Sequence, residues 1–66
     1  MKIKDLMYYF SSDELLEFID IHDTKHFIIL TPRNVLLLDD YESYYLLRIE
    51  SGKFGDSNIR LYIEKR

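Results

Sequence analysis

The chain contains no cysteine and no tryptophan, and it has only two glycines and one proline among its 66 residues. Without cysteine it forms neither disulfide bonds nor thiolate metal sites, so its stability must come from apolar packing or from association. The same absence fits a reducing compartment, and we expect a cytoplasmic protein. No apolar run is long enough to span a membrane, and the charged segment 1–5 does not have the apolar core of a secretion signal.

What the chain does contain is apolar and aromatic surface. Hydrophobic residues make up 47% of the sequence and aromatic residues 15%, including six tyrosines and four phenylalanines. This content excludes a disordered chain. We expect a single domain over residues 1–66, which on folding buries about 60% of the surface that the unfolded chain exposes and is therefore of marginal stability.

Charge is distributed unevenly along the sequence. The net charge is −3, but residues 1–42 carry nine acidic and four basic side chains, whereas residues 43–66 carry five basic and three acidic ones. An acidic balance of this kind disfavours a general nucleic-acid binder. The sequence therefore predicts an acidic N-terminal part and a mildly basic C-terminal part.

Helical spacing marks the N-terminal segment. Four apolar residues recur at i, i+3, i+4 and i+7 and share one stripe of a helix: Ile3, Leu6, Met7 and Phe10. We predict a second short helix over residues 12–20, where Ser11 or Ser12 can act as the N-cap. A strand over residues 17–21 is the competing interpretation, because apolar and polar residues alternate there.

Two apolar runs in residues 27–40, FIILTPRNVLLLDD, are separated by turn-forming residues. Pro32 fixes φ for the first central position of a tight turn, which favours a β-hairpin with strands over residues 26–31 and 34–39. A third strand is predicted over residues 44–50, followed by a loop that contains both glycines. The last strand, residues 58–64, shows the alternation of a half-buried strand.

The predicted fold is thus α+β, with one or two short N-terminal helices packed on a four-stranded antiparallel β-meander. Charge and ring pairing favour one register for the last two strands over a register that opposes two arginines. This register sets the following residues opposite one another: Glu50 and Arg60, Arg48 and Tyr62, Ile49 and Leu61, and Leu47 and Ile63.

The same parity leaves large apolar side chains on the second face of the sheet, beside Tyr44. They are Phe27, Ile29, Leu36, Leu38 and Leu46. Together they would form a patch of a few hundred Å², at the upper range for soluble monomers. Three explanations stay open at this point: the two helices cover opposite faces, two copies of the chain form a homodimer, or a different protein binds there.

Two groups of residues are of metal-binding types. The first is His22 and His26 with Asp20 and Asp23, and the second is Asp39, Asp40 and Glu42. The first falls in a predicted turn, and the second lacks the spacing and the glycine of a calcium loop. No motif fixes a serine, histidine or carboxylate in catalytic geometry either. We therefore predict no catalytic residues, no metal and no cofactor.

Two binding functions remain. The favoured one is a non-enzymatic protein–protein interaction module, an inhibitor or modulator that docks an acidic, tyrosine-rich surface on a larger protein, for which a nucleic-acid-binding protein is one option. The residues of this surface are Tyr8, Tyr9, Asp39, Asp40, Tyr41, Glu42 and Tyr44. The alternative is binding of single-stranded nucleic acid on a sheet face formed by Tyr44, Arg48, Arg60 and Tyr62.

Overall fold

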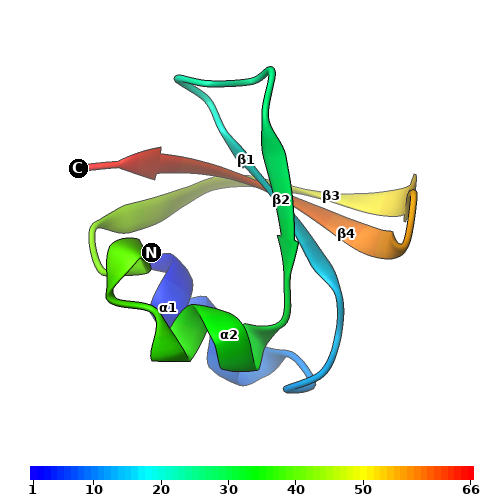
Figure 1. The fold of residues 1–66 in the computed structure, drawn as a ribbon, viewed down its shortest axis with the longest axis horizontal. Helices are drawn as coiled ribbons and strands as arrows, with labels where there is room; N and C mark the ends of the chain where they lie inside the picture. The colour runs from blue at the N-terminus through cyan, green and yellow to red at the C-terminus, as the bar shows by residue number, and fades with distance from the viewer.

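A mixed sheet of four strands forms the framework of the computed structural model, which describes residues 1–66 (Figure 1). The helical segments are short and lie on one face of this sheet. In chain order the elements are α1 (Ile3–Leu6), the 3₁₀ helix η1 (Met7–Tyr9), β1 (Leu16–Asp20), β2 (Phe27–Leu30), α2 (Pro32–Leu37), the 3₁₀ helix η2 (Asp39–Tyr41), β3 (Tyr44–Phe54) and β4 (Ser57–Lys65). The expected α+β class is confirmed, as is a short N-terminal helix.

The strands lie in the order β2-β1-β4-β3 across the sheet. β1 and β2 are antiparallel, and so are β3 and β4, but the two central strands, β1 and β4, run parallel. The predicted antiparallel meander is therefore wrong. A meander places each strand beside the next one along the chain, whereas this chain leaves the sheet after β2, passes through α2 and η2, and returns at the opposite edge as β3.

The segment predicted as a second helix, residues 12–20, contains β1, so the helix prediction is wrong and the competing strand is of the right type. Leu16 and Phe18 are buried, and Glu17 between them is only 4% exposed. The Glu17 carboxylate accepts a hydrogen bond from Nε of Arg60 at 2.8 Å. Pairing with β2 on one side and β4 on the other overrides the local helical spacing, because strand preference depends on cross-strand neighbours.

Pro32 begins a helix rather than a hairpin turn, so the predicted strand over residues 34–39 is wrong. Thr31 is the N-cap of α2, and its Oγ1 accepts a hydrogen bond from the backbone N–H of Asn34 at 3.3 Å. Proline suits the first helical turn because its missing N–H has no partner to lose there. Val35 packs into the core, whereas Leu37 is 74% exposed.

The register of β3 and β4 is confirmed for three of the four predicted pairs. Glu50 lies opposite Arg60, Arg48 opposite Tyr62, and Ile49 opposite Leu61. The fourth pair is wrong, because a bulge at Leu47 shifts the strand and places Leu46 opposite Ile63. One extra residue in a strand shifts the alternation of side chains between the two faces of the sheet. Residues 44 and 46, which precede the bulge, therefore lie on the helical face, opposite to the prediction.

The predicted loop between the last two strands is much shorter than expected. β3 continues to Phe54 and β4 begins at Ser57, so only Gly55 and Asp56 form the turn. Gly55 has φ 65°, a left-handed value that glycine adopts without the steric cost of a Cβ. A two-residue turn of this kind joins the two longest strands of the molecule.

One apolar cluster lies between the sheet and the helices. Its buried members are Ile3, Leu6, Met7, Leu16, Phe18, Val35, Leu61 and Ile63. The helices do not cover both faces of the sheet, so that explanation of the surplus apolar surface is wrong. None of the helices has the length and hydropathy needed to cross a bilayer.

Candidate functional site

The free edge of β2 is the least protected part of the sheet. β2 pairs with β1 along one edge only, and its other edge is unpaired. In Figure 1, β2 lies in front of the other strands. All four residues of the strand are apolar. Phe27 is 61% exposed and Ile28 is 46% exposed. An edge strand with unpaired backbone groups and no charged side chain is a template for another strand.

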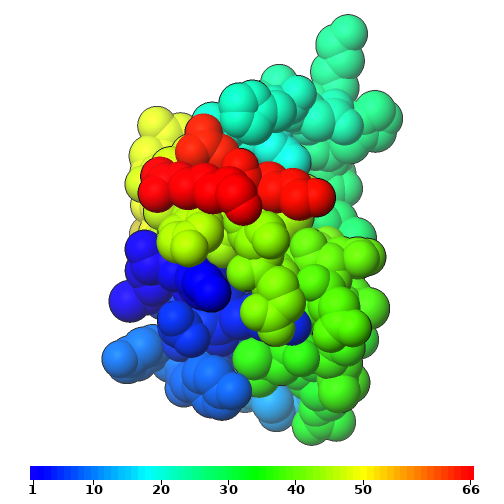
Figure 2. Space-filling model, turned by 90° about the vertical axis from the view of Figure 1, so that its left-hand side faces the viewer, coloured from blue at the N-terminus to red at the C-terminus, as the bar shows by residue number.

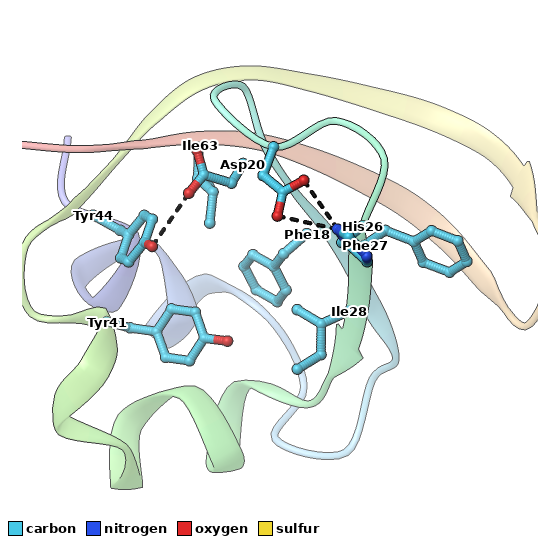
Figure 3. A pocket seen from close by; sticks show the side chains of 9 residues that line it. Phe18, Asp20, His26, Phe27, Ile28, Tyr41, Tyr44 and Ile63 are labelled. Carbon is cyan, nitrogen blue, oxygen red and sulfur yellow. Dashed lines mark hydrogen bonds and ion pairs between the residues drawn. The ribbon is translucent and has the colours of Figure 1, made fainter.

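A pocket of about 370 Å³ lies beside β2 on the helical face of the sheet (Figure 3). Phe18 of β1 and Ile28 of β2 point toward it, and Tyr41 of η2 and Tyr44 of β3 close its other side. The rings of Phe18 and Tyr41 are 6.2 Å apart, and those of Tyr41 and Tyr44 are 5.6 Å apart. Residues from four separate elements therefore meet at one aromatic pocket next to the free edge.

Two carboxylates lie at the rim of this pocket. Asp20 accepts hydrogen bonds from the hydroxyl of Tyr44 at 3.3 Å and from the backbone N–H of His22 at 3.0 Å. Asp23 contacts Nδ1 of His26 through both carboxylate oxygens, at 3.0 and 3.1 Å. The pocket thus combines aromatic walls with an acidic rim.

The two tyrosines report this environment through their pKa values. Burial raises the pKa of Tyr41, and the charge of Asp40 raises it further. Burial also raises the pKa of Tyr44, followed by the charge and the hydrogen bond of Asp20 and smaller effects of Tyr41 and Asp40. Burial is the larger cause of both pKa shifts, and the neighbouring carboxylates Asp40 and Asp20 add to it because a phenol ionises less readily near negative charge.

The predicted acidic, tyrosine-rich surface divides into two parts. Tyr8 and Tyr9 project from η1 with 76% and 79% of their surface exposed. The acidic side chains around η2 are exposed too; they are Asp39, Asp40 and Glu42. Figure 2 shows the N-terminal segment in blue beside the green segment that contains η2. Tyr41 and Tyr44 instead turn toward the pocket.

The five predicted interface residues do not share one face. On β2, Phe27 points away from the pocket and the helices in Figure 3, and Ile29 shares its side of the sheet because side chains of a strand alternate. Leu36 and Leu46 pack against the core, and Leu38 follows α2 and is 41% exposed. The single apolar face was inferred from a second strand that does not exist, so only its β2 part remains.

The predicted nucleic-acid face is also divided, because Tyr44 lies on the opposite side of the sheet from Arg48 and Tyr62. The guanidinium of Arg48 lies 4.2 Å from the ring centre of Tyr62. The hydroxyl of Tyr62 donates to Glu50 at 2.7 Å, and Arg60 is paired with Glu17. Arg48 also lies 3.9 Å from Glu50, so each arginine on this face is close to a carboxylate, which weakens the attraction for phosphate.

No group of three or more His, Cys, Asp or Glu side chains converges in the way a metal ion requires. His22 and His26 turn to different partners. Nε2 of His22 lies 3.4 Å from Glu64, whereas His26 contacts Asp23. The spacing of four residues therefore does not bring the two imidazoles together.

Sequence reasoning missed the pocket because it placed Phe18 and Asp20 on a helix and Ile28 in a different strand pairing. The parallel pairing of β1 with β4 and the course of the chain through η2 are what bring these residues together. Comparison of the chain with protein-family models, with curated proteins and with solved structures found no match.

Proposed function

We propose that the chain is a non-enzymatic protein-interaction module that binds an extended segment of a larger protein as an additional strand along the free edge of β2. The observation that carries this proposal is an edge strand made only of apolar residues, with no element of the chain covering it. In strand addition, backbone hydrogen bonds supply affinity and pockets beside the edge supply specificity.

The length of β2 limits how much a bound strand gains from backbone pairing. The strand has four residues, and alternate residues face β1, so about two of them offer their backbone groups outward. Such a short edge needs further contacts for stable binding. The exposed side chains of Phe27 and Ile28 and the adjacent pocket provide them.

The partner that fits this surface is basic. The chain carries a net charge of −3, and exposed acidic side chains surround the pocket and η2. Complementary charge speeds the encounter of two proteins and rejects partners of the same sign. We therefore propose a modulator or inhibitor of a basic protein in the cytoplasm, with Asp39, Asp40 and Glu42 steering its approach.

A second copy of the chain is the competing occupant of the edge. Pairing β2 with β2 of another copy would bury the same apolar residues, but it would bring two chains of charge −3 together. We expect a monomer at micromolar concentration in sedimentation velocity. A dimer that dissociates on Phe27→Lys would overturn the proposal in favour of self-association.

The direct test is selection of a random peptide display library against the immobilised chain, followed by NMR of the selected peptides with the protein in solution. We expect these peptides to slow hydrogen exchange of the outward amides of β2, because an added strand accepts hydrogen bonds from them. Methylation of alternate peptide nitrogens should abolish binding in one register and leave it unchanged in the other.

Two matched variants locate the site on the protein. Phe27→Lys on β2 and Leu47→Lys on β3 each replace an exposed apolar side chain of an edge strand. We expect the first to weaken peptide binding by at least about tenfold and the second to leave it unchanged, since a lysine on an edge strand opposes strand pairing. Equal effects of the two variants, or a library that yields no binder, would refute the proposal.

A further inference from the structure

The pocket beside β2 opens on the same side of the molecule as the free edge of that strand. Figure 1 views the free edge directly, and Figure 3 looks into the pocket with Ile28 pointing into it and Phe27 pointing away. Side chains of a strand alternate between its two faces. Every second side chain of a strand added to β2 therefore points toward the mouth of the pocket, past Ile28.

The walls of the pocket suit a long side chain with an apolar stem. Phe18, Ile28, Tyr41 and Ile63 supply apolar and aromatic surface, and the volume is about 370 Å³. Aromatic ring faces carry negative partial charge and attract cations. Lysine and arginine bury their methylene stems against such surface while their charged ends reach polar groups.

The rim of the pocket is negatively charged, which favours a positively charged ligand. Asp20 and Asp23 are the only formally charged carboxylates that line the pocket, and the one basic side chain there, His26, already contacts Asp23. Asp20 accepts two hydrogen bonds, from Tyr44 and from the backbone of His22, and a carboxylate has about four acceptor positions. Asp20 can therefore accept further hydrogen bonds from a cation, and an anion would be repelled.

We infer that this pocket receives the side chain of a lysine or arginine from the bound segment, with Asp20 as the carboxylate that pairs with it and Phe18, Tyr41 and Tyr44 as the walls around its stem. The inference rests on the proposed strand addition for the origin of the side chain. The pocket itself can be tested without a peptide.

The test uses three small probes of equal chain length, n-butylammonium, n-butylguanidinium and n-butanol, titrated into the isotope-labelled protein and followed by NMR. We expect the two cations to shift the signals of Phe18, Ile28 and Tyr44 and to bind at least about tenfold more tightly than butanol, because a charged hydrogen bond and the ring faces favour them. Added salt should weaken binding of the cations and leave that of butanol unchanged.

Variants assign the preference to one carboxylate. Asp20→Asn keeps the shape of the side chain and its acceptor oxygen but removes the charge, and we expect it to abolish the preference for cations. Asp56→Asn removes the same charge in the β3–β4 turn, where it does not line the pocket, and should leave the preference intact.

The outcomes separate this inference from the proposed function. Equal binding of butanol and the cations, or a preference that survives Asp20→Asn, would overturn the cation pocket while strand addition to β2 could still be observed with selected peptides. Cation binding in the pocket, together with failure of every peptide to protect β2, would uphold the pocket and overturn strand addition.

Discussion

The two edges of the sheet differ in whether another segment of the chain pairs with the edge strand. At the β3 edge, Lys2 forms an antiparallel bridge with Tyr45, and the backbone N–H of Leu46 donates to the carbonyl of Met1 at 2.8 Å. Further along, the bulge at Leu47 disrupts the ladder. At the β2 edge no segment pairs with the strand, and its four side chains are apolar.

This difference between the two edges is the basis for the proposed binding site at β2. Native proteins protect sheet edges with bulges, charged residues, covering segments or short strands. β3 is long and is protected in several of these ways, whereas the only protection of β2 is that it is short. A short edge does not invite extensive aggregation, yet it remains open to one strand that gains additional contacts from the neighbouring pocket.

The protection of the β3 edge depends on Ile3, which anchors the N-terminal segment in the core and is 0% exposed. We expect Ile3→Ala to lower the free energy of unfolding by about 2–5 kcal/mol, because it leaves a cavity in a close-packed core. Urea denaturation measures the change. Phe27→Ala on the open edge is the matched control, and its loss should be much smaller because Phe27 is 61% exposed. Equal losses would contradict the distinction between the edges.

Removal of residues 1 and 2 should convert the protected edge into an open one. Without the carbonyl of Met1, the amide of Leu46 loses its hydrogen bond. We expect its hydrogen exchange to accelerate by at least about tenfold while the amides of β1 and β4 change little, since local opening differs between parts of a structure. NMR hydrogen exchange on a chain that begins at Ile3 provides the measurement. Unchanged protection of Leu46 would show that this contact does not cover the edge.

The end of the open edge is set by the helix cap at Thr31. Thr31→Ala removes the acceptor for the N–H of Asn34 and should destabilise the fold by about 1 kcal/mol. Thermal or urea unfolding measures it. Thr24→Ala, at an exposed position in the β1–β2 turn, is the control and should have almost no effect. A cost at Thr24 as large as that at Thr31 would argue against the cap.

The pocket beside the open edge predicts a small dependence of stability on alkaline pH. The pKa values of Tyr41 and Tyr44 are raised in the folded state, so the folded state retains protons that the unfolded state loses. The contribution of these two tyrosines to stability is therefore fully present below about pH 10, the pKa of an unperturbed tyrosine, and is lost as the pH rises above that value. Urea unfolding at several alkaline pH values should show a weaker decline for the Tyr41→Phe and Tyr44→Phe double variant.

The exposed Tyr9→Phe serves as the control for that experiment, because the side chain lies outside the pocket. It should reproduce the pH dependence of the original chain. A double variant with the same alkaline decline as the control would mean that the two pocket tyrosines do not contribute to it.

Local patterns in the sequence were sufficient for several elements. The i, i+3, i+4 spacing of Ile3, Leu6 and Met7 marks the N-terminal helical segment, and these three residues are buried. Alternation predicts β4, and opposite charges predict the pairing of Glu50 with Arg60. Each of these inferences uses neighbours along the chain or a tight hairpin, where the sequence itself sets the spacing.

The errors arose where two structures share the same local chemistry. Threonine, proline and asparagine favour both a tight turn and a helix N-terminus, so Thr31–Asn34 does not distinguish a hairpin from α2. Residues 12–20 have helical spacing, yet Leu16–Asp20 within them form β1 between β2 and β4. A single bulge at Leu47 then moved Tyr44 from the predicted outer face into the pocket.

The sequence by itself determined the class of the fold, the acidic balance and the surplus of apolar surface, because these depend on composition and short-range periodicity. Only the tertiary structure decided that part of this surplus lies at the open edge of β2, beside a pocket lined by residues of β1, β2, η2, β3 and β4. β1 pairs with β4, whose residues lie about forty positions further along the chain. Backbone hydrogen bonds are the same for all residue types except proline, so the local sequence of a strand does not specify which distant strand pairs with it.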